Sequence, residues 1–188
     1  MGKEVGNKLT PEQVGTREHE VFERTILPYV NAAYNLARWL TRSDADAEDI
    51  VQESFLRALR SFSSFIQGRD ARAWLLAIVR NCCRTWMRRR GSREGAIQID
   101  ESARAIGVWP DPEALVVENM NSQLVRQAVE DLPIEYREIL ILRELEELSY
   151  KEIAGILGVP LGTVMSRLSR SRRELQSRLC AVTEERRP

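Results

Sequence analysis

The sequence has 188 residues, of which 43% are hydrophobic and 30% are charged, and its formal net charge is zero. A chain of this size and composition forms one ordinary domain or two small ones, and it is too apolar to be a disordered polymer. No apolar run approaches the roughly 20 residues that cross a bilayer, and the polar N-terminus is unlike a secretion signal. These features predict a cytoplasmic protein without membrane insertion.

The zero net charge conceals two basic segments with an acidic one between them. Six arginines and no acid lie in Arg80–Arg93, and four arginines and no acid lie in Thr163–Arg173. The stretch Glu94–Leu161 holds fourteen acids against five bases. Such separation indicates a polyanionic partner that is contacted at two places, although a charge run is more often a solvated face.

Apolar residues recur at helical spacing, and no alternating β-branched run indicates a strand. Residues 1–20 lack this periodicity and are expected to form a loose tail. Helices are predicted over residues 21–40, 44–62 and 71–90. Ser43 and Asp44 are candidate N-caps of the second of these helices, because acids crowd its first turn.

Residues 94–112 lose the helical periodicity and are rich in glycine and proline, which is typical of a linker. This segment divides the chain into a first helical domain, residues 21–93, and a second one, residues 113–182. We therefore expect an all-α protein of two small helical domains joined by a flexible linker. In the second domain, helices are predicted over residues 113–130 and 134–148.

The segment from Ser149 onward has the pattern of a helix-turn-helix. Ser149 and Glu152 match the S-x-x-E capping box, Gly158 permits the positive φ of a tight turn, and Pro160 suits the start of the next helix. Opposite its apolar stripe, that helix carries hydroxyls and arginines at Thr163, Ser166, Arg167, Arg170 and Arg173. We expect this face to bind DNA, and the alternative is an ordinary antiparallel helix pair.

The cysteines and the single histidine, His19, do not have metal-ligand spacing, because Cys82 and Cys83 are adjacent and Cys180 is distant. No metal site and no cofactor is expected. We interpret the thiols as buried or idle, while the arginines near Cys82 and Cys83 leave a redox role open. The sequence has no P-loop and no G-x-G-x-x-G motif, so an enzyme is not expected.

Two parts of the chain resemble a known family. Residues 46–59 (DAEDIVQESFLRAL) and 71–90 (ARAWLLAIVRNCCRTWMRRR) resemble the second conserved region of extracytoplasmic-function (ECF) sigma factors, group 4 of the sigma-70 family. Residues 131–175 resemble their fourth conserved region. Both regions occur in order over roughly residues 22–179, which is far more specific than a helix-turn-helix alone. The resemblance implies the promoter-specificity subunit of bacterial RNA polymerase.

The resemblance implies that the fourth region binds the −35 element as duplex DNA. The matching residues are Met165, Ser166, Arg167, Ser169 and Arg170, and Thr163 and Arg173 share their helix. The family often has a basic residue at the position of Met165, so one phosphate contact is expected to be missing here.

The second region would recognise and open the −10 element, which requires cations for the backbone and a polar pocket for a splayed base. The candidates are Arg80, Arg84, Arg88 and Arg89 for the backbone, Asn81 for reading a base and Trp74 for stacking. Trp86 lies on the inner stripe of its helix, which favours a place in the core over stacking.

Five polar residues recur at steps of three and four and can share one helix face, namely Asp46, Asp49, Gln52, Glu53 and Arg57. The resemblance assigns this face to the clamp helices of the largest polymerase subunit, whereas the residues alone indicate a solvated face. The implied partners are core RNA polymerase at its clamp helices and flap, promoter DNA and an anti-sigma factor. An autonomous helix-turn-helix regulator is the alternative, but it would leave residues 46–90 without a purpose.

Overall fold

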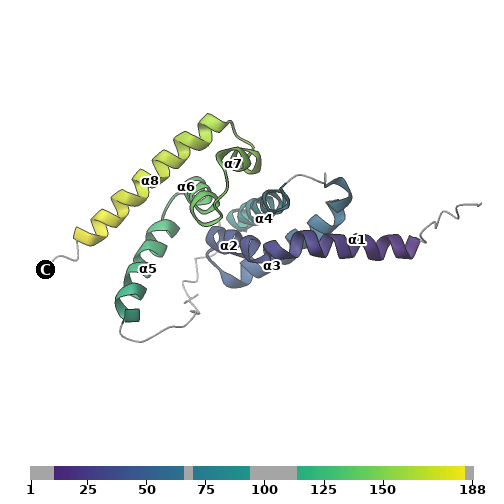
Figure 1. Ribbon diagram of the computed structural model, residues 1–188. Coiled ribbons are helices and arrows are strands. Elements are labelled where there is room, and N and C mark those ends of the chain that lie inside the picture. The colour runs from purple at the N-terminus through teal and green to yellow at the C-terminus, as the bar shows by residue number, and fades with distance from the viewer. Residues whose placement is uncertain (1–10, 66–69, 94–113, 185–188) are drawn as a thin grey trace, which may run out of the picture.

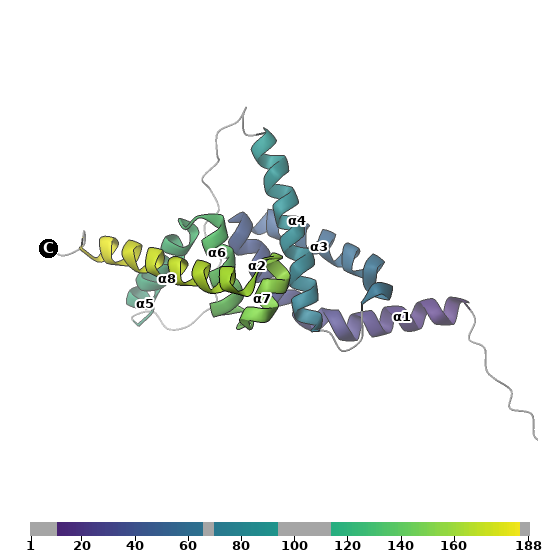
Figure 2. The same ribbon diagram turned by 90° about the horizontal axis from the view of Figure 1, so that it is seen from above.

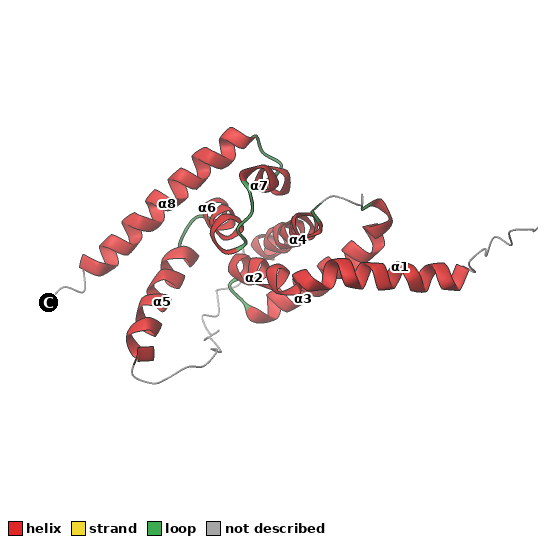
Figure 3. Cartoon of the chain, in the orientation of Figure 1, coloured by secondary structure: helices red, strands yellow, loops and turns green. Residues whose placement is uncertain are grey.

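The computed structural model describes residues 11–65, 70–93 and 114–184, and its regular elements in these ranges are all helical (Figure 1, Figure 3). The prediction of an all-α fold is therefore confirmed. The predicted linker, residues 94–112, and the first ten residues of the predicted tail lie outside the described ranges. We call the helices of residues 11–93 the first helical unit and those of residues 114–184 the second helical unit.

The first helical unit follows the predicted helices closely. Its elements are α1 (Pro11–Ile26), the short η1 (Leu27–Tyr29), α2 (Val30–Thr41), α3 (Asp44–Ser61), the short η2 (Phe62–Ser64) and α4 (Ala71–Arg93). Arg42 ends α2 with a left-handed φ of 62°. The Ser43 side chain then accepts a hydrogen bond from the Asp46 backbone N–H at 3.3 Å. The predicted N-cap of α3 at Ser43 is thus confirmed.

Helix α1 begins at Pro11 and not near residue 21. The prediction of a loose tail is therefore wrong for residues 11–20, which form the first turns of this helix. Its C-terminal end is anchored by the buried side chains of Phe22 and Ile26. Once a helix is anchored, each further turn adds backbone hydrogen bonds without needing an apolar stripe, and proline is well suited to a first position. Figure 2 shows α1 extending away from the remaining helices.

The second helical unit contains α5 (Ala114–Glu130), α6 (Ile134–Leu140), the wide π-helical turn η3 (Ile141–Leu145), α7 (Tyr150–Leu157) and α8 (Leu161–Glu184). The single helix predicted over residues 134–148 is thus shorter and changes its winding at η3. The amide of Glu146 reaches back to the carbonyl of Ile141 at 3.0 Å, and the Leu148 amide bonds the Leu142 carbonyl at 3.0 Å. This widening ends the helix, and Glu147 follows with a positive φ of 51°.

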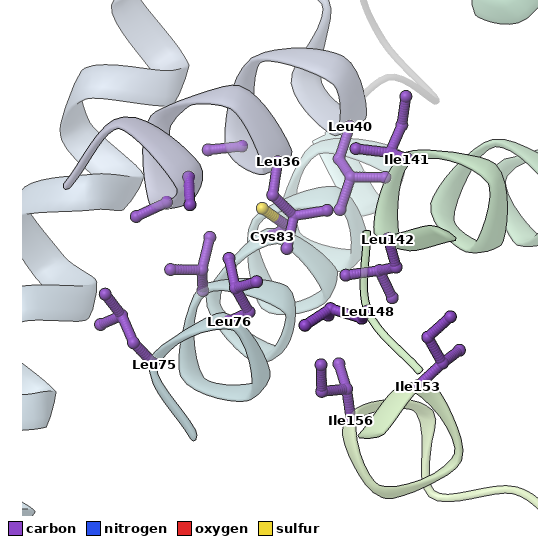
Figure 4. Close-up of a cluster of buried hydrophobic side chains, with 14 of the residues drawn as sticks. Leu36, Leu40, Leu75, Leu76, Cys83, Ile141, Leu142, Leu148, Ile153 and Ile156 are labelled. Carbon is purple, nitrogen blue, oxygen red and sulfur yellow. The ribbon is translucent and has the colours of Figure 1, made fainter. Parts of the chain in front are cut away.

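The two helical units pack against each other through one continuous apolar core. Figure 4 shows the joint, where side chains from the two units face one another. The first unit contributes Leu36, Leu40, Leu76 and Cys83, and the second contributes Ile141, Leu142, Leu148, Ile153 and Ile156. All nine are less than a tenth exposed. Burial of a leucine or isoleucine side chain contributes about 1.5–3 kcal/mol, so this joint holds the units in the arrangement of Figure 1.

Candidate functional site

Helices α7 and α8 form the predicted helix-turn-helix. The Ser149 side chain accepts from the Glu152 amide at 3.3 Å, and the Glu152 carboxylate accepts from the Ser149 amide at 2.7 Å. Gly158 ends α7 with a φ of 65°. The Pro160 carbonyl then accepts from the amides of Thr163 and Val164, at 2.9 and 3.2 Å. The predicted capping box and glycine turn are confirmed, and they aim α8 along the outer edge of the molecule (Figure 1).

The outer face of α8 presents most of the predicted DNA-facing residues to solvent. The exposed members are Met165, Ser166, Ser169, Arg170 and Arg173. Two of the predicted residues are less available: Thr163 is half-buried, and the half-buried Arg167 lies 3.4 Å from the Glu135 carboxylate. The helix is held from behind by Val164 and Leu168, which are fully buried. Its outer surface can therefore enter a groove without disturbing the core.

A shallow groove runs beside this outer face. It is lined by Tyr150, Met165, Leu168, Ser169, Arg172, Arg173 and Gln176. On its rim, the Arg172 guanidinium donates to the Glu144 carboxylate at 2.6 and 3.0 Å, and this hydrogen bond raises the pKa of Arg172 above its ordinary value. Arg173 is exposed, and Arg172 is charge-paired, so Arg173 is the arginine of this groove better placed for an external phosphate.

The basic segment Arg80–Arg93 lies on α4, and several of its arginines are on the exposed side of this helix. The exposed predicted residues are Asn81, Arg84, Arg88 and Arg89. Arg88 also donates to the Thr85 hydroxyl at 3.3 Å. Figure 2 shows the C-terminal part of α4, which carries these arginines, projecting beyond the neighbouring helices. The side chains of these four residues are therefore accessible from outside the packed helices.

Arg80 does not lie on that exposed side. Its side chain is only 7% exposed, and its guanidinium forms a bidentate ion pair with Glu138 of α6, with a second hydrogen bond of 3.4 Å. It also donates to the Ile156 carbonyl of α7 at 3.3 Å. The sequence groups Arg80 with Arg84 as a candidate cation for the DNA backbone, but in this arrangement Arg80 is not available to an external phosphate, because the second helical unit packs over this part of α4.

Several other polar contacts cross the joint, and the sequence did not reveal them. Arg72 pairs with Glu146, whose side chain is 3% exposed, and Arg38 lies 4.0 Å from the Glu130 carboxylate. Arg137 donates to the Trp39 carbonyl across the joint at 3.3 Å. The available signal was an acid inside an apolar run, as at Glu138 within "EILIL", because a carboxylate there needs a buried partner.

Arg137 itself closes the end of α5. It is 4% exposed and donates to the carbonyls of Val129 at 3.3 Å and Leu132 at 2.9 Å, as well as to that of Glu130. Burial is the main reason that the pKa of Arg137 falls to about 10, and the nearby Arg42 lowers it further. The guanidinium stays charged at neutral pH and satisfies carbonyls that the helix end leaves open.

The tryptophans of α4 pack within the first helical unit. The Trp86 indole donates to the Asp46 carboxylate at 3.2 Å, and the Arg90 guanidinium lies 5.1 Å from the ring centroid. Trp74 packs against Phe62 and Phe65, with ring centroids 6.4 and 5.0 Å apart. Both tryptophans are half-buried. The Trp86 side chain is therefore used in packing within the first helical unit, and much of the Trp74 ring is covered by Phe62 and Phe65.

The predicted polymerase face of α3 is largely exposed. Asp49, Gln52 and Glu53 are exposed, and Arg57 donates to Glu53 at 2.7 Å one turn apart. This bond lowers the pKa of the Glu53 carboxyl below its ordinary value. Asp46 is the exception, because its carboxylate is held by Trp86 and by Arg90 at 3.3 Å. Leu56, 50% exposed on the same helix, is a residue that the polar pattern missed.

The thiols do not form a reactive cluster. Cys82 and Cys83 are buried, while Cys180 is exposed. Burial raises the pKa of Cys83 to about 12, so its nucleophilic thiolate is scarce at neutral pH. Within the described ranges, no group of three or more histidine, cysteine or acidic residues is placed to hold a metal ion. No described helix is both long and apolar enough to span a membrane.

Alkylation should separate the three cysteines. At mildly alkaline pH, iodoacetamide is expected to modify Cys180 of the native protein, and to reach Cys82 and Cys83 only after denaturation. Intact-mass spectrometry counts the modified thiols, and peptide mapping assigns them. Modification of Cys83 as rapid as that of Cys180 would contradict the burial and the raised pKa.

Sequence comparisons show that the chain is similar to sigma factors. The family models for sigma-70 region 2 and sigma-70 region 4 match residues 25–93 and 122–175. The chain is 30% identical over 186 residues to the ECF RNA polymerase sigma-E factor of Salmonella typhimurium, covering 95% of this chain and 97% of that protein. It is 32% identical over 164 residues to the ECF RNA polymerase sigma factor SigE of Mycolicibacterium smegmatis, covering 87% of this chain and 63% of that protein.

Solved structures show the same likeness. The sigma factor RpoE from Bartonella quintana, in complex with the anti-sigma factor NepR, superposes with a TM-score of 0.72 at 30% identity and covers 85% of this chain and 97% of that one. CnrH, in complex with the cytosolic domain of CnrY, gives a TM-score of 0.63 at 24% identity and shares the fold, covering 87% of this chain and 90% of that one. Both solved structures therefore share the arrangement of helices with this chain.

Proposed function

This chain belongs to the ECF sigma factors of the sigma-70 family, transcription initiation factors that work with RNA polymerase, and we propose that its two arginine-bearing faces contact the two elements of a promoter. The observation that carries this proposal is the exposure of arginines on α8 and on α4, on two separate faces of one molecule. Because the arginines of both faces are attracted to DNA phosphates, the protein can bind DNA at two points.

Helix α8 is proposed to enter the major groove of the −35 element. The N-terminal residues of the second helix of a helix-turn-helix approach base edges, and those of α8 include the exposed Ser166 and Ser169. Arg170 and Arg173 follow on the same face and reach phosphates or guanine. Arg167 and Thr163 are proposed as secondary contacts, and Arg167 must first leave Glu135.

Helix α4 is proposed to hold the melted −10 element. Arg84, Arg88 and Arg89 supply charge along the strand, and the exposed Asn81 offers both a donor and an acceptor for a base edge. Trp74 is half-buried against Phe62 and Phe65, so only the exposed part of its ring is proposed to stack on a base. Arg80 can join these residues only after its ion pair with Glu138 has broken.

The exposed face of α3 is proposed as the contact with the clamp helices of the largest polymerase subunit. Asp49, Gln52 and Glu53 precede Leu56 on the same side of α3, so the surface combines an exposed apolar side chain with polar neighbours. The second helical unit would contact the flap. Asp46 is proposed to act indirectly, since it holds Trp86 and Arg90 in place.

We propose that an anti-sigma factor controls this protein and that both act in the cytoplasm, where RNA polymerase works. Support comes from the related sigma factor of Bartonella quintana, which was solved in complex with its anti-sigma factor. In the closed joint, Arg80 is covered by the second helical unit and cannot reach DNA while the units stay together. Opening of the joint is therefore part of the proposed activation.

Run-off transcription tests the proposed function. Core polymerase with this protein is expected to start transcription on genomic fragments that core alone ignores. The double variant Arg170→Ala, Arg173→Ala should reduce the transcript on the order of 100-fold, because each lost charge-assisted hydrogen bond costs roughly 1.5–3 kcal/mol. Arg178→Ala is the matched control, since that arginine lies further along α8 and pairs with Glu174 at 2.9 Å.

Two outcomes would contradict the proposal. With active core and no inhibitor, the absence of transcripts from all fragments would remove the sigma function. Tight and specific binding of a duplex by the free protein, without polymerase, in a gel-shift experiment would favour an autonomous helix-turn-helix regulator.

A further inference from the structure

The first turns of α8 carry an apolar strip on a surface that is otherwise polar. Leu161 is 48% exposed and Met165 is 54% exposed, and the two are four residues apart on one side of the helix. Their neighbours toward the outer face are Ser166, Ser169 and Arg170, all exposed. Met165 is thus a large apolar side chain, half exposed, on the side of α8 that also carries hydroxyls and a guanidinium group.

Packing of the second helical unit does not explain Met165. The buried seam of α8 consists of Val164, Leu168 and Ser171, each at most 1% exposed. At about 100° per residue, Met165 lies roughly 100° from Val164 and only about 40° from Ser169. Leu161 lies about 80° from Ser169 by the same measure, so Met165 is the member of the strip nearer to the proposed DNA-facing side.

The chemical groups exposed in the major groove limit which base an apolar side chain can recognise. Base edges there offer hydrogen-bond donors and acceptors, and the apolar group among them is the 5-methyl group of thymine. Methionine cannot donate a hydrogen bond, and its unbranched, polarisable thioether adapts to a methyl group. The neighbouring Arg170 and Arg173 supply the charge that brings the helix to the DNA backbone.

We infer that Met165 is a specificity-determining residue that contacts the 5-methyl group of one thymine in the −35 duplex. The inference rests on the proposed function and deepens it. Burial of about one methyl group between protein and DNA corresponds to roughly a fourfold difference in affinity.

A deoxyuridine scan tests the contact, because deoxyuridine lacks only the methyl group of thymine. On a promoter found by run-off transcription, each thymine of the upstream duplex is replaced in turn, and the affinity of the holoenzyme is measured. One position is expected to lose about fourfold in affinity with the wild-type protein. The Met165→Ala holoenzyme should bind thymine and deoxyuridine equally well at that position.

Two further variants complete the design. Met165→Leu keeps an apolar side chain and should keep part of the thymine preference, which guards against a folding defect in the alanine variant. Leu145→Ala is the matched control, because Leu145 is an equally exposed apolar residue, 50%, that lies in η3 and not on α8. It should leave the full fourfold preference in place.

The results separate this inference from the function on which it rests. A flat scan with a wild-type holoenzyme that initiates normally would overturn the inference and leave the sigma function standing. A sensitive position that remains equally sensitive in Met165→Ala would also overturn it. A holoenzyme that initiates on no fragment would remove the proposed function and the inference together.

Discussion

Replacing Glu138 with glutamine is expected to weaken the joint between the two helical units by about 3–5 kcal/mol. The substitution preserves the shape of the side chain but leaves the Arg80 guanidinium buried without a countercharge. Separation of the two units would remove this free-energy cost, because it exposes Arg80 to water. Small-angle X-ray scattering should therefore report a larger radius of gyration, and urea should unfold the variant at a lower concentration.

A matched substitution in an exposed ion pair separates this effect from the loss of any negative charge. Glu144→Gln breaks the pair with Arg172, whose side chains are about half exposed, and should change stability by no more than about 1 kcal/mol. An unchanged radius and an unchanged urea midpoint for Glu138→Gln would show that the ion pair does not hold the joint. Replacing both Arg80 and Glu138 by methionine should restore much of the closed form.

The double variant Arg84→Ala, Arg88→Ala is expected to impair promoter opening far more than polymerase binding. Both arginines are exposed on α4, whereas the face proposed to contact the polymerase lies on α3. Loss of two charged contacts to the strand, each worth roughly 1.5–3 kcal/mol, should reduce open complexes about 100-fold or more. Permanganate footprinting measures the opening, and a pull-down with core polymerase measures the binding.

The control for this prediction is Arg24→Ala, since Arg24 is an exposed arginine of the first helical unit that lies on α1. It should leave both measurements near the wild-type level. Equal losses of opening and of polymerase binding in the double variant would refute the assignment of these arginines to the −10 strand.

Local signals in the sequence predicted the elements of the second helical unit well where short-range chemistry decides them. The capping box at Ser149 and Glu152 and the turn at Gly158 depend on residues within four positions of one another. The widening at η3 was not predictable in this way. It ends a helix whose apolar residues continue, because Ile141 and Leu142 follow the surface of the first unit.

The candidate sites also differ in how far short-range patterns predict them. The α8 face was predictable because its polar residues oppose an apolar stripe on one helix, and a helical wheel suffices to separate them. The α4 face was predictable at Arg84 but not at Arg80, although the two residues lie one turn apart. Arg80 meets Glu138, which is 58 positions away, so local periodicity contains no information about the pair.

The sequence by itself determined the helical class, the two-region organisation, the helix-turn-helix and the exposed arginines of α8. These follow from periodicity, capping chemistry and motif order, which act over short stretches of chain. Only the tertiary structure decided which cations are free, because burial depends on which helices pack together. Arg80 illustrates this, because the joint encloses a cation that the sequence grouped with the exposed arginines of α4.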